Sequence, residues 1–589
     1  MSTIGALLIA LWGCHEPPKS IDDTGLRDTT APDIHAPASL SCEPADGAGV
    51  SLIIENRGDG ALQLTGFAFS ESGSVFSLGS VPTNVLGPGE STDLPVRCDS
   101  DGALTEVVLY IDSDDPVTPV IEVLLSTPQS TGTTDTGDTG DTGDTGDTGD
   151  TGDTAPPIVA VELSLGEAAA IYIGENQGEL AGSMVLGAGD VDGDGFDDLL
   201  VGAPSKDAVA VNAGEVHLIS GQAEPAGHSL VAATARITGD AHAWLGAALA
   251  AGDVDADGFA DVWLGSRTLE RGGVMAGGAL LFLGPLSGSL TLDDADRILL
   301  GNEGDGAGAS LDAVDLNGDG YSDLVAGGQW DGRGEVYVVS GPVSSSSSLT
   351  DLAVARVRGA DDGDYAGVEV HGAADVNGDG VEDLLVGAFG AGEGAGAIYL
   401  LHGPLYGEVS VNNAEATLRG GAGEAVHQSD GAGDVDGDGY GDVLVGVPTT
   451  PTGKAHLVLG GDLSGEVALA DAHARFTGES ADGYAGADVA GVGDLNADGF
   501  ADLLIGAHAA RDGGAAYLIA GPVEGHRSLA NADVILLAEA DNDGAGASVA
   551  LAGDADGDGA PDLLIGARQS DTTSTDQGAA YLLLGGLLP

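Results

Sequence analysis

The most regular pattern of polar and apolar positions is an acidic stretch followed directly by a short apolar run. Residues 189–204 read GDVDGDGFDDLLVGAP, where five acidic residues fall within nine positions before the chain turns apolar. The acidic stretch returns seven times at spacings of 59 to 63 residues. Its copies begin at Asp190, Asp253, Asp315, Asp375, Asp434, Asp494 and Asp554. A repeat of this length predicts either propeller blades or a solenoid.

Each repeat also contains three further strand-like segments. An inner segment leads into the acidic stretch, a second apolar run is bounded by glycine (GEVHLISG in the first copy), and a third precedes the next glycine-rich entry (TARITG). Short runs of this kind between glycine turns are typical of strands, and helical periodicity is scarce. Four short strands repeated seven times predict an all-β fold, a seven-bladed β-propeller.

The two ends of the repeat region predict how the ring closes. The seventh repeat reaches only its third strand before Pro589, and a segment of the fourth-strand type, AAIYIGEN, stands at residues 169–176. An N-terminal strand that completes the last blade removes the exposed sheet edges that an open array would have. We therefore predict a closed propeller over residues 158–589.

A smaller β domain is predicted before the repeats. Residues 35–127 contain alternating strands separated by Gly, Pro and Asp turns, which indicates a small β-sandwich. This segment resembles the immunoglobulin-like modules of the choice-of-anchor and ASPM/SPD-2/hydin type. The resemblance rests on the residues NRGDG at 56–60, PGES at 88–91 and SDDP at 113–116.

The remaining segments predict export and spacing. Residues 15–34 are rich in Pro, Asp and Thr and are predicted to be a tether, and residues 128–157 hold six TGD repeats, which predict a disordered linker. Residues 1–14 contain an apolar run too short to span a bilayer and suited to a signal peptide. Its end, LWGC, resembles the lipobox of bacterial lipoproteins, which implies acylation of Cys14; an ordinary signal peptide is the alternative.

Export bears on the other cysteines and on where the protein resides. Cys42 and Cys98 both lie in the predicted sandwich, where an exported location would permit a disulfide, although the number of cysteines does not prove the pairing. We expect an outer-membrane lipoprotein or cell-surface protein, otherwise a secreted one. Contact with a membrane is expected only through the lipid anchor.

The charge balance excludes one class of partner. Lys and Arg total 18 against 94 Asp and Glu, which gives a formal net charge of −76. Such a chain repels nucleic acid phosphates and anionic membrane surfaces, and it favours bound cations. Nucleic acid binding is therefore not expected.

The acidic stretches follow the pattern D-x-[DN]-x-D-G-x-x-D, numbered here as positions 1 to 9. Side chains at positions 1, 3, 5 and 9 with the carbonyl at position 7 would form a cage of oxygen atoms, which selects a hard cation and favours Ca²⁺ over Mg²⁺. Glycine at position 6 permits the tight bend. An EF-hand is excluded because Val201, at position 12 of the first loop, falls in a strand.

Up to seven Ca²⁺ ions are predicted, with Asp197, at position 8 of the first loop, pointing outward. A set of Asp–Gly turns without metal is the alternative, and mutual repulsion of three or four carboxylates argues against it. The predicted ligands are Asp190, Asp192, Asp194, Phe196 and Asp198; Asp253, Asp255, Asp257, Phe259 and Asp261; Asp315, Asn317, Asp319, Tyr321 and Asp323; Asp375, Asn377, Asp379, Val381 and Asp383; Asp434, Asp436, Asp438, Tyr440 and Asp442; Asp494, Asn496, Asp498, Phe500 and Asp502; and Asp554, Asp556, Asp558, Ala560 and Asp562.

The repeats resemble the FG-GAP repeats of the integrin α-chain propeller. The GAP element is best kept in VGAP at residues 201–204, whereas the FG element is replaced by Ala181-Gly182 and Leu245-Gly246. The resemblance implies calcium loops on one face of the ring and partners on the opposite face, at the loops after strands two and four. Those loops contain Trp244, Trp330, Phe389 and Tyr484, which either anchor a partner or cap the blade packing.

No catalytic motif stands out. The chain has no H-E-x-x-H, no G-x-S-x-G and no P-loop, and His217 and His456 occupy strand positions that predict core packing. We therefore expect a non-enzymatic, monomeric, calcium-binding surface propeller for adhesion or protein interaction, with a surface protein or glycan as its partner. A lectin-like carbohydrate-binding propeller and a purely structural envelope protein are the alternatives.

Overall fold

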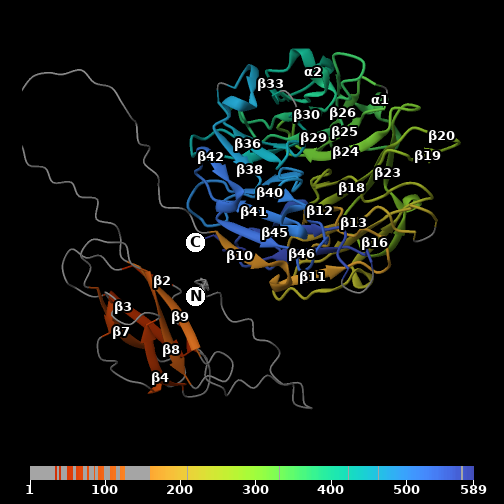
Figure 1. Ribbon diagram of the computed structural model, residues 1–589. Coiled ribbons are helices and arrows are strands. Elements are labelled where there is room, and N and C mark those ends of the chain that lie inside the picture. Colours follow the sequence, from red (N-terminus) through yellow and green to blue (C-terminus); the bar gives the residue numbers. More distant parts are fainter. Residues whose placement is uncertain are drawn as a thin grey trace, which may run out of the picture. The chain divides into compact units, whose positions relative to one another are not determined.

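The structure is a computed structural model of the chain, which divides into two compact units, Met1–Gly152 and Asp153–Pro589 (Figure 1). It describes residues 160–588 apart from 208–209, 331, 422–423, 462 and 572–574, and the backbones of nine strands between residues 34 and 126. The predicted signal peptide with Cys14, the tether, Cys42 and the TGD linker lie outside the described residues. Within the described part, no helix has the length and apolar character needed to cross a bilayer.

The first unit contains two sheets. One has the order β1-β3-β7-β5 and the other β2-β9-β8-β4-β6, and all pairs are antiparallel except β2 with β9. Cys98 lies opposite Phe76 in the register of β7 and β5. The immunoglobulin-like assignment stays a prediction. The strands are β1 (Ile34–His35), β2 (Ser39–Ser41), β3 (Val50–Asn56), β4 (Leu62–Phe69), β5 (Phe76–Leu78), β6 (Val85–Leu86), β7 (Ser91–Cys98), β8 (Glu106–Ser113) and β9 (Val120–Ser126).

The second unit is the predicted seven-bladed propeller, and each blade is a five-stranded sheet (Figure 1). The first strands are β12 (Met184–Gly189), β17 (Leu249–Gly252), β24 (Ala307–Val314), β29 (Glu369–Gly372), β34 (Gln428–Gly433), β39 (Asp488–Gly491) and β44 (Ala545–Gly553). The second strands are β13 (Asp198–Ala203), β18 (Asp261–Ser266), β25 (Asp323–Gly328), β30 (Leu384–Ala388), β35 (Asp442–Val447), β40 (Leu503–Ala507) and β45 (Asp562–Ala567). The third strands are β14 (Glu215–Ile219), β21 (Gly278–Phe282), β26 (Glu335–Val339), β31 (Ala397–Leu401), β36 (Lys454–Val458), β41 (Ala515–Ile519) and β46 (Ala579–Leu583). The fourth strands are β16 (Ala235–Thr238), β23 (Arg297–Leu300), β28 (Ala355–Arg358), β33 (Ala416–Arg419), β38 (Ala474–Thr477), β43 (Val534–Leu537) and β11 (Ala170–Ile173).

The expectation of four strands per blade was too low, because a short edge strand from the following repeat joins each sheet. For example, β22 falls between the third and fourth strands of blade 2 in the sequence, but it pairs in parallel with β16 of blade 1. The backbone hydrogen bonds of this edge strand therefore join each blade to its neighbour. These fifth strands are β22 (Gly288–Thr291), β27 (Ser347–Ser348), β32 (Gly407–Ser410), β37 (Gly465–Ala468), β42 (Gly525–Ser528), β10 (Val161–Ser164) and β15 (His228–Ser229). Blade 2 also carries a small hairpin, β19 (Glu270–Arg271) with β20 (Val274–Met275), and the only α-helical turns among the described residues are α1 (Leu349–Leu352) and α2 (Ala391–Gly394).

Two N-terminal strands close the ring. The predicted strand within residues 169–176 is confirmed as β11, which pairs antiparallel with β46 of blade 7, Ala170 opposite Leu582. The sequence interpretation missed β10, which pairs in parallel with β43 and gives blade 6 its fifth strand. In Figure 1 both orange strands lie against blue ones from the far end of the chain.

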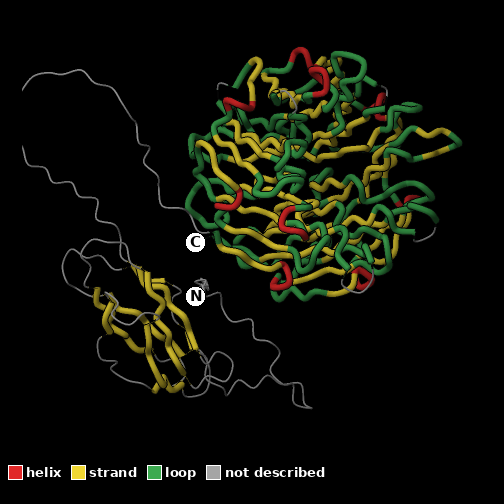
Figure 2. The backbone as a smooth tube through the Cα atoms, in the orientation of Figure 1, coloured by secondary structure: helices red, strands yellow, loops and turns green. Residues whose placement is uncertain are grey.

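The hydrophobic core lies between adjacent sheets. All six residues of β13 are buried, because a neighbouring blade covers each face of the sheet. One apolar cluster, for example, joins Leu200 and Val216 of blade 1 to Val262 and Leu280 of blade 2. Figure 2 shows strands and loops throughout this unit, with only short helical turns among them. The buried positions predicted for His217 and His456 are confirmed, and burial lowers the pKa of His217 to about 3.

The closing strand should therefore carry a measurable share of the stability. Tyr172 of β11 is buried in a cluster with Leu582 of β46 and Leu199 of β13. We expect Tyr172→Ala to lower the free energy of unfolding by about 3–5 kcal/mol, as for other large aromatic residues removed from a core. Denaturant unfolding of the full chain measures this loss. Val231→Ala, at an exposed position, is the control, and an equal effect of the two variants would show that β11 does not hold the ring closed.

Candidate metal centres

All seven acidic loops share one backbone conformation, between the first and second strands of each blade. The glycine at position 6 is left-handed in every copy, as in Gly195 with φ 93° and Gly499 with φ 95°, which confirms the tight bend predicted there. Position 4 is left-handed as well, and it holds this conformation even where alanine replaces glycine, at Ala256 and Ala497.

Carboxylates at positions 1 and 5 fold each loop around themselves. In the first loop, Asp190 accepts hydrogen bonds from the backbone N–H groups of Gly193 at 2.7 Å, Asp194 at 3.1 Å and Gly195 at 3.0 Å. The Asp194 carboxylate in turn accepts one from Phe196 at 3.0 Å. The bonds from position 6 to position 1 and from position 7 to position 5 recur in all seven loops.

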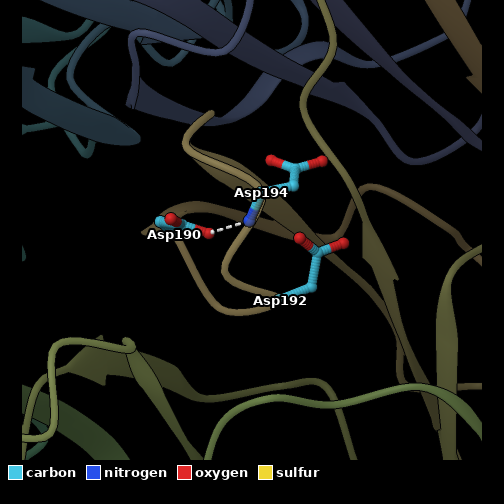
Figure 3. A group of neighbouring side chains, drawn as sticks. All are labelled: Asp190, Asp192 and Asp194. Atoms are coloured by element: carbon cyan, nitrogen blue, oxygen red, sulfur yellow. Dashed lines mark hydrogen bonds between the residues drawn. The ribbon is translucent and has the colours of Figure 1, made fainter.

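These bonds bring predicted ligands together. Figure 3 shows the side chains of Asp190, Asp192 and Asp194 gathered around the first loop, with the Asp194 N–H directed at Asp190. In the four loops whose pattern positions are all Asp, three carboxylates offer oxygen atoms within 4.8 Å of one another. The groups are Asp190, Asp192 and Asp194; Asp253, Asp255 and Asp261; Asp434, Asp436 and Asp442; and Asp554, Asp556 and Asp558.

The donor set fits a hard cation. Every clustered ligand is a carboxylate oxygen, which Ca²⁺ and Mg²⁺ prefer. The Oδ1 atoms of Asp192 and Asp554 are buried and have no hydrogen-bond partner among the described residues. A buried acceptor without a donor is unfavourable, and a bound cation would satisfy it.

The position 9 carboxylates have a second role that the sequence did not reveal. Asp198 is fully buried, and it accepts hydrogen bonds from Val191 at 2.9 Å in its own loop and from Gly221 at 2.9 Å after the third strand. The bond from the glycine two residues after the third strand recurs in all seven blades. Position 9 therefore ties the loop to the sheet, and among the described residues it belongs to a cluster of three carboxylates only in the loops of Asp261 and Asp442.

Burial makes these carboxylates hard to ionise. Desolvation, with repulsion from neighbouring loop carboxylates such as Asp192, raises the pKa of Asp198 to about 7 in spite of its backbone hydrogen bonds. The same causes raise the pKa of Asp261 and Asp442 to about 6 and that of Asp562 to about 7. Negative charge at position 9 is thus unfavourable unless a cation compensates it.

Three loops carry Asn at position 3, and it takes part in the same fold of the loop. The Asn317 side-chain amide donates to the Asp323 carboxylate at 3.0 Å, and that of Asn496 donates to Asp498 at 3.0 Å. Asn377 instead accepts from the Asp379 N–H at 2.8 Å.

Adjacent loops are linked around the ring, which the sequence interpretation also missed. A Cβ at Gly193 would overlap the ring of Phe259, which is position 7 of the next loop, and Gly437 faces Phe500 in the same way. In the backbone, the N–H of Ala260 donates to the carbonyl of Asp190 at 2.9 Å. The corresponding backbone bond is present in five of the seven pairs of neighbouring loops, so most loops rest on the one before them.

The outward position predicted for Asp197 is wrong. Its carboxylate accepts a hydrogen bond from the Asp554 N–H at 2.8 Å, and its own N–H donates to the Asp554 carbonyl at 3.2 Å. Asp197 therefore bridges blades 1 and 7, where the ring closes. Glu382, at the same position in blade 4, accepts from the Asp315 N–H at 3.1 Å.

The four aromatic residues singled out in the sequence lie in loops at the other end of the strands. Because strands alternate in direction, loops after strands two and four leave the face opposite to the acidic loops. Trp330, Phe389 and Tyr484 are 43%, 38% and 43% exposed, and Trp244 is half-buried. Phe389 stacks on Tyr365 with ring centroids 5.1 Å apart, and Tyr484 stacks on His508 at 5.1 Å.

A polar cavity of about 900 Å³ opens beside loops of the same kind, after β11 and after β13. Lys206 is buried in its wall, with its Nζ 3.1 Å from Glu175 and 3.1 Å from Glu215. Charged side chains such as Asp207 and Arg236 and amide and hydroxyl side chains such as Asn176 and Thr238 line the rest.

The repeats match a known family model. The FG-GAP repeat model matches residues 184–219, 307–339, 366–401, 428–458, 485–519 and 545–583, which lie in every blade except the second. Six of the seven blades of the propeller therefore match the FG-GAP repeat.

Two of the relatives that this chain resembles are integrin alpha chains. Integrin alpha pat-2 of Caenorhabditis briggsae is 29% identical over 229 residues, which cover 35% of this chain and 18% of that protein. Integrin alpha-7 of Rattus norvegicus is 33% identical over 153 residues, 24% of this chain and 12% of that protein. The chain spans less than a fifth of the length of these relatives.

Among solved structures, a protein of unknown function from Porphyromonas gingivalis W83 matches 18% of this chain and 50% of its own, at 18% identity. Its TM-score of 0.16 is too low to support a comparison of folds.

The link between neighbouring loops can be tested by a double-mutant cycle. Gly193→Ala forces a Cβ into the Phe259 ring at a left-handed position, and we expect it to cost roughly 1–3 kcal/mol of unfolding free energy. In a Phe259→Ala background, only the backbone strain should remain. Gly195→Ala is the control, because a Cβ there meets nothing within 4 Å and its cost should not depend on Phe259. A coupling energy for Gly193 and Phe259 below about 0.5 kcal/mol would contradict the contact.

Proposed function

We propose that the chain is an exported, non-enzymatic surface protein whose propeller binds calcium ions through its acidic loops and a partner through its opposite face. The observation that carries the proposal is the convergence of three carboxylates in each all-Asp loop, with orphaned buried oxygens at Asp192 and Asp554. The integrin relatives support a role in adhesion or protein interaction.

Bound Ca²⁺ would supply the positive charge that the loops lack. The carboxylates at positions 1, 3, 5 and 9 and the carbonyl at position 7 would hold it, up to one ion in each of the seven loops. Because position 9 also binds the end of the third strand, an ion at the loop would favour the ionised form of that carboxylate and so strengthen the anchoring bond. The loops are linked around the ring, so this stiffening would extend to the whole acidic face.

The opposite face has the features of a partner surface. Trp330 and Phe389 lie in the loops after the second strands of blades 3 and 4, and Trp244 and Tyr484 lie in loops after fourth strands. Exposed aromatic rings held rigidly by stacking are effective anchors in interfaces, because they bury a large area at small entropic cost.

The signal peptide, lipidation of Cys14 and a Cys42–Cys98 disulfide belong to the same proposal, since an exported surface protein requires the first and permits the others. Carbohydrate binding is the second candidate. The observation that favours it is the polar cavity beside Lys206, whose mixed lining of charged, amide and hydroxyl side chains offers many hydrogen-bond partners to a polyhydroxylated ligand.

Calcium should stabilise the propeller. We expect the full chain to melt at a higher temperature in excess Ca²⁺ than in EGTA, because a ligand bound only by the folded state adds about 2.7 kcal/mol per site at a hundred times its Kd. Asp192→Ala, which removes the ligand oxygen that Asn at this position would keep, should lower the Ca²⁺ stoichiometry by one in equilibrium dialysis and reduce the calcium-dependent rise in melting temperature. Asp541→Asn, an exposed acid outside the acidic loops, should change neither. Equal melting curves with Ca²⁺ and EGTA would refute the metal proposal.

The aromatic face should carry the partner. We expect Trp330→Ala and Phe389→Ala each to weaken capture of the partner from cell-surface extract at least about tenfold, the effect of losing an interface anchor worth about 1.4 kcal/mol or more. Tyr406→Ala is the matched control, because Tyr406 is 65% exposed but lies in a loop after a third strand, on the acidic face. A quantitative pull-down with purified variants measures the effect.

An equal loss from Tyr406→Ala would move the partner site away from the aromatic face. Binding on a glycan array that disappears in EGTA, with no protein captured, would favour the carbohydrate alternative.

A further inference from the structure

The seven first strands surround the propeller axis, and their polar residues are distributed unequally. These strands contact one another in a closed ring, β12 against β17 and so on to β44 against β12. The strands of blades 1 and 2 are apolar apart from their glycines, and that of blade 7 carries only Ser548 as a polar residue. Blades 3 to 6 contribute four carboxylates and a histidine: Asp312, Glu369, His371, Asp430 and Asp488.

One part of this polar set is structural. Asp312 accepts a hydrogen bond from the Gly372 N–H at 2.7 Å, Asp430 from Gly491 at 3.1 Å, and Asp488 from Val549 at 2.8 Å. Each bond joins the first strand of one blade to that of the next. Ser310 and Ser548 make the same kind of link with neutral hydroxyls, so the linking role does not require charge.

Glu369 makes the same link through one of its oxygens, but its second oxygen and the His371 imidazole are not accounted for by this role. Glu369 is buried, and its Oε1 accepts from the Ser429 N–H at 2.9 Å, but its Oε2 has no hydrogen-bond partner among the described residues. The Nε2 atom of His371 lies 3.5 Å from Glu369 Oε1, longer than a normal hydrogen bond. On the other side of the ring, Nδ1 lies 3.8 Å from Asp430 Oδ1.

These separations suit two ligands of one metal ion. A nitrogen and an oxygen each about 2.1 Å from a tetrahedral metal are about 3.4 Å apart. A ligating histidine commonly directs its other ring nitrogen at a carboxylate, which is where Asp430 lies.

We propose that the Glu369 carboxylate and His371 Nε2 bind one divalent cation of the class that accepts imidazole, such as Zn²⁺, on the axis of the propeller. Asp430 positions the imidazole, and the negative charges of Asp312 and Asp488 increase the attraction for the ion. Water completes the coordination, since the His371 side chain is partly exposed. The nitrogen ligand separates this site from the all-oxygen loops, because imidazole favours Zn²⁺ over Ca²⁺.

The electrostatics of the cluster point the same way. Four carboxylates, those of Glu369, Asp430, Asp312 and Asp488, surround the one imidazole of His371. A divalent cation between them would relieve the mutual repulsion of the ionised carboxylates.

Zinc titration of the full chain tests the site independently of the calcium proposal. When Ca²⁺ saturates the acidic loops, isothermal titration calorimetry should show one Zn²⁺ ion bound per chain. Its affinity should be well above that of Zn²⁺ for exposed acidic side chains. His371→Gln should abolish that equivalent, and Asp430→Asn should weaken it roughly 10- to 100-fold, as for other residues that orient a ligand. His508→Gln, a histidine stacked on Tyr484 away from the axis, is the matched control and should leave it unchanged.

A second measurement does not depend on the folding of the variants. With Co²⁺ as the probe, the unaltered chain should show the visible absorption of a nitrogen-ligated ion of low coordination number. No Zn²⁺ equivalent, an equivalent that survives His371→Gln, or a Co²⁺ spectrum of an all-oxygen six-coordinate ion would each overturn the proposal.

Discussion

The buried carboxylate at position 9 is the interaction on which the rest of the propeller depends. It accepts hydrogen bonds from its own loop and from the glycine two residues after the third strand, as Asp198 does with Val191 and Gly221. One side chain thus fixes three consecutive strands at the same end of the blade. The arrangement is possible only because the charge is desolvated, and the raised pKa shows that the desolvation is costly. A cation bound near these loops would therefore offset this cost and stabilise the fold itself.

The sequence predicted the blades because each carries the same strong signals: an acidic loop, glycine turns and apolar runs at a constant spacing. It did not predict the fifth strands. Segments such as Val161–Ser164 and Gly288–Thr291 are four residues long and half polar, and a parallel edge strand gains its partner from another repeat rather than from its own pattern. The periodicity of polar and apolar residues within one repeat carries no information about pairing with a strand of another repeat. The contact between Asp197 and Asp554 could not be predicted for the same reason, because the two residues are 357 positions apart in the sequence.

Other features of the site were present in the sequence but needed comparison between repeats. Position 4 of a loop is glycine where position 7 of the next loop is a large residue, as with Gly193 and Phe259. It is alanine at Ala497, where position 7 of the next loop is the small Ala560. That pairing is visible once the loops are aligned in ring order. Ala256 before Tyr321 departs from it, so the pattern becomes a contact only when the structure shows the ring against the glycine.

Sevenfold repetition also separates what the fold needs from what it does not. Positions 1, 5, 6 and 9 of the loops behave alike in every blade, so their hydrogen bonds belong to the architecture. Departures from the repeat do not share that explanation: the exposed aromatic rings occur in some blades only, and His371 has no counterpart in the other first strands. Serine at Ser310 and Ser548 makes the same bond between strands as the carboxylates do, and it does so without a desolvated charge. The fold would therefore be better served by serine at Glu369. Glu369 makes this bond to Ser429 at the cost of a buried carboxylate with an orphaned oxygen beside an imidazole, which argues for a second role besides the link between strands.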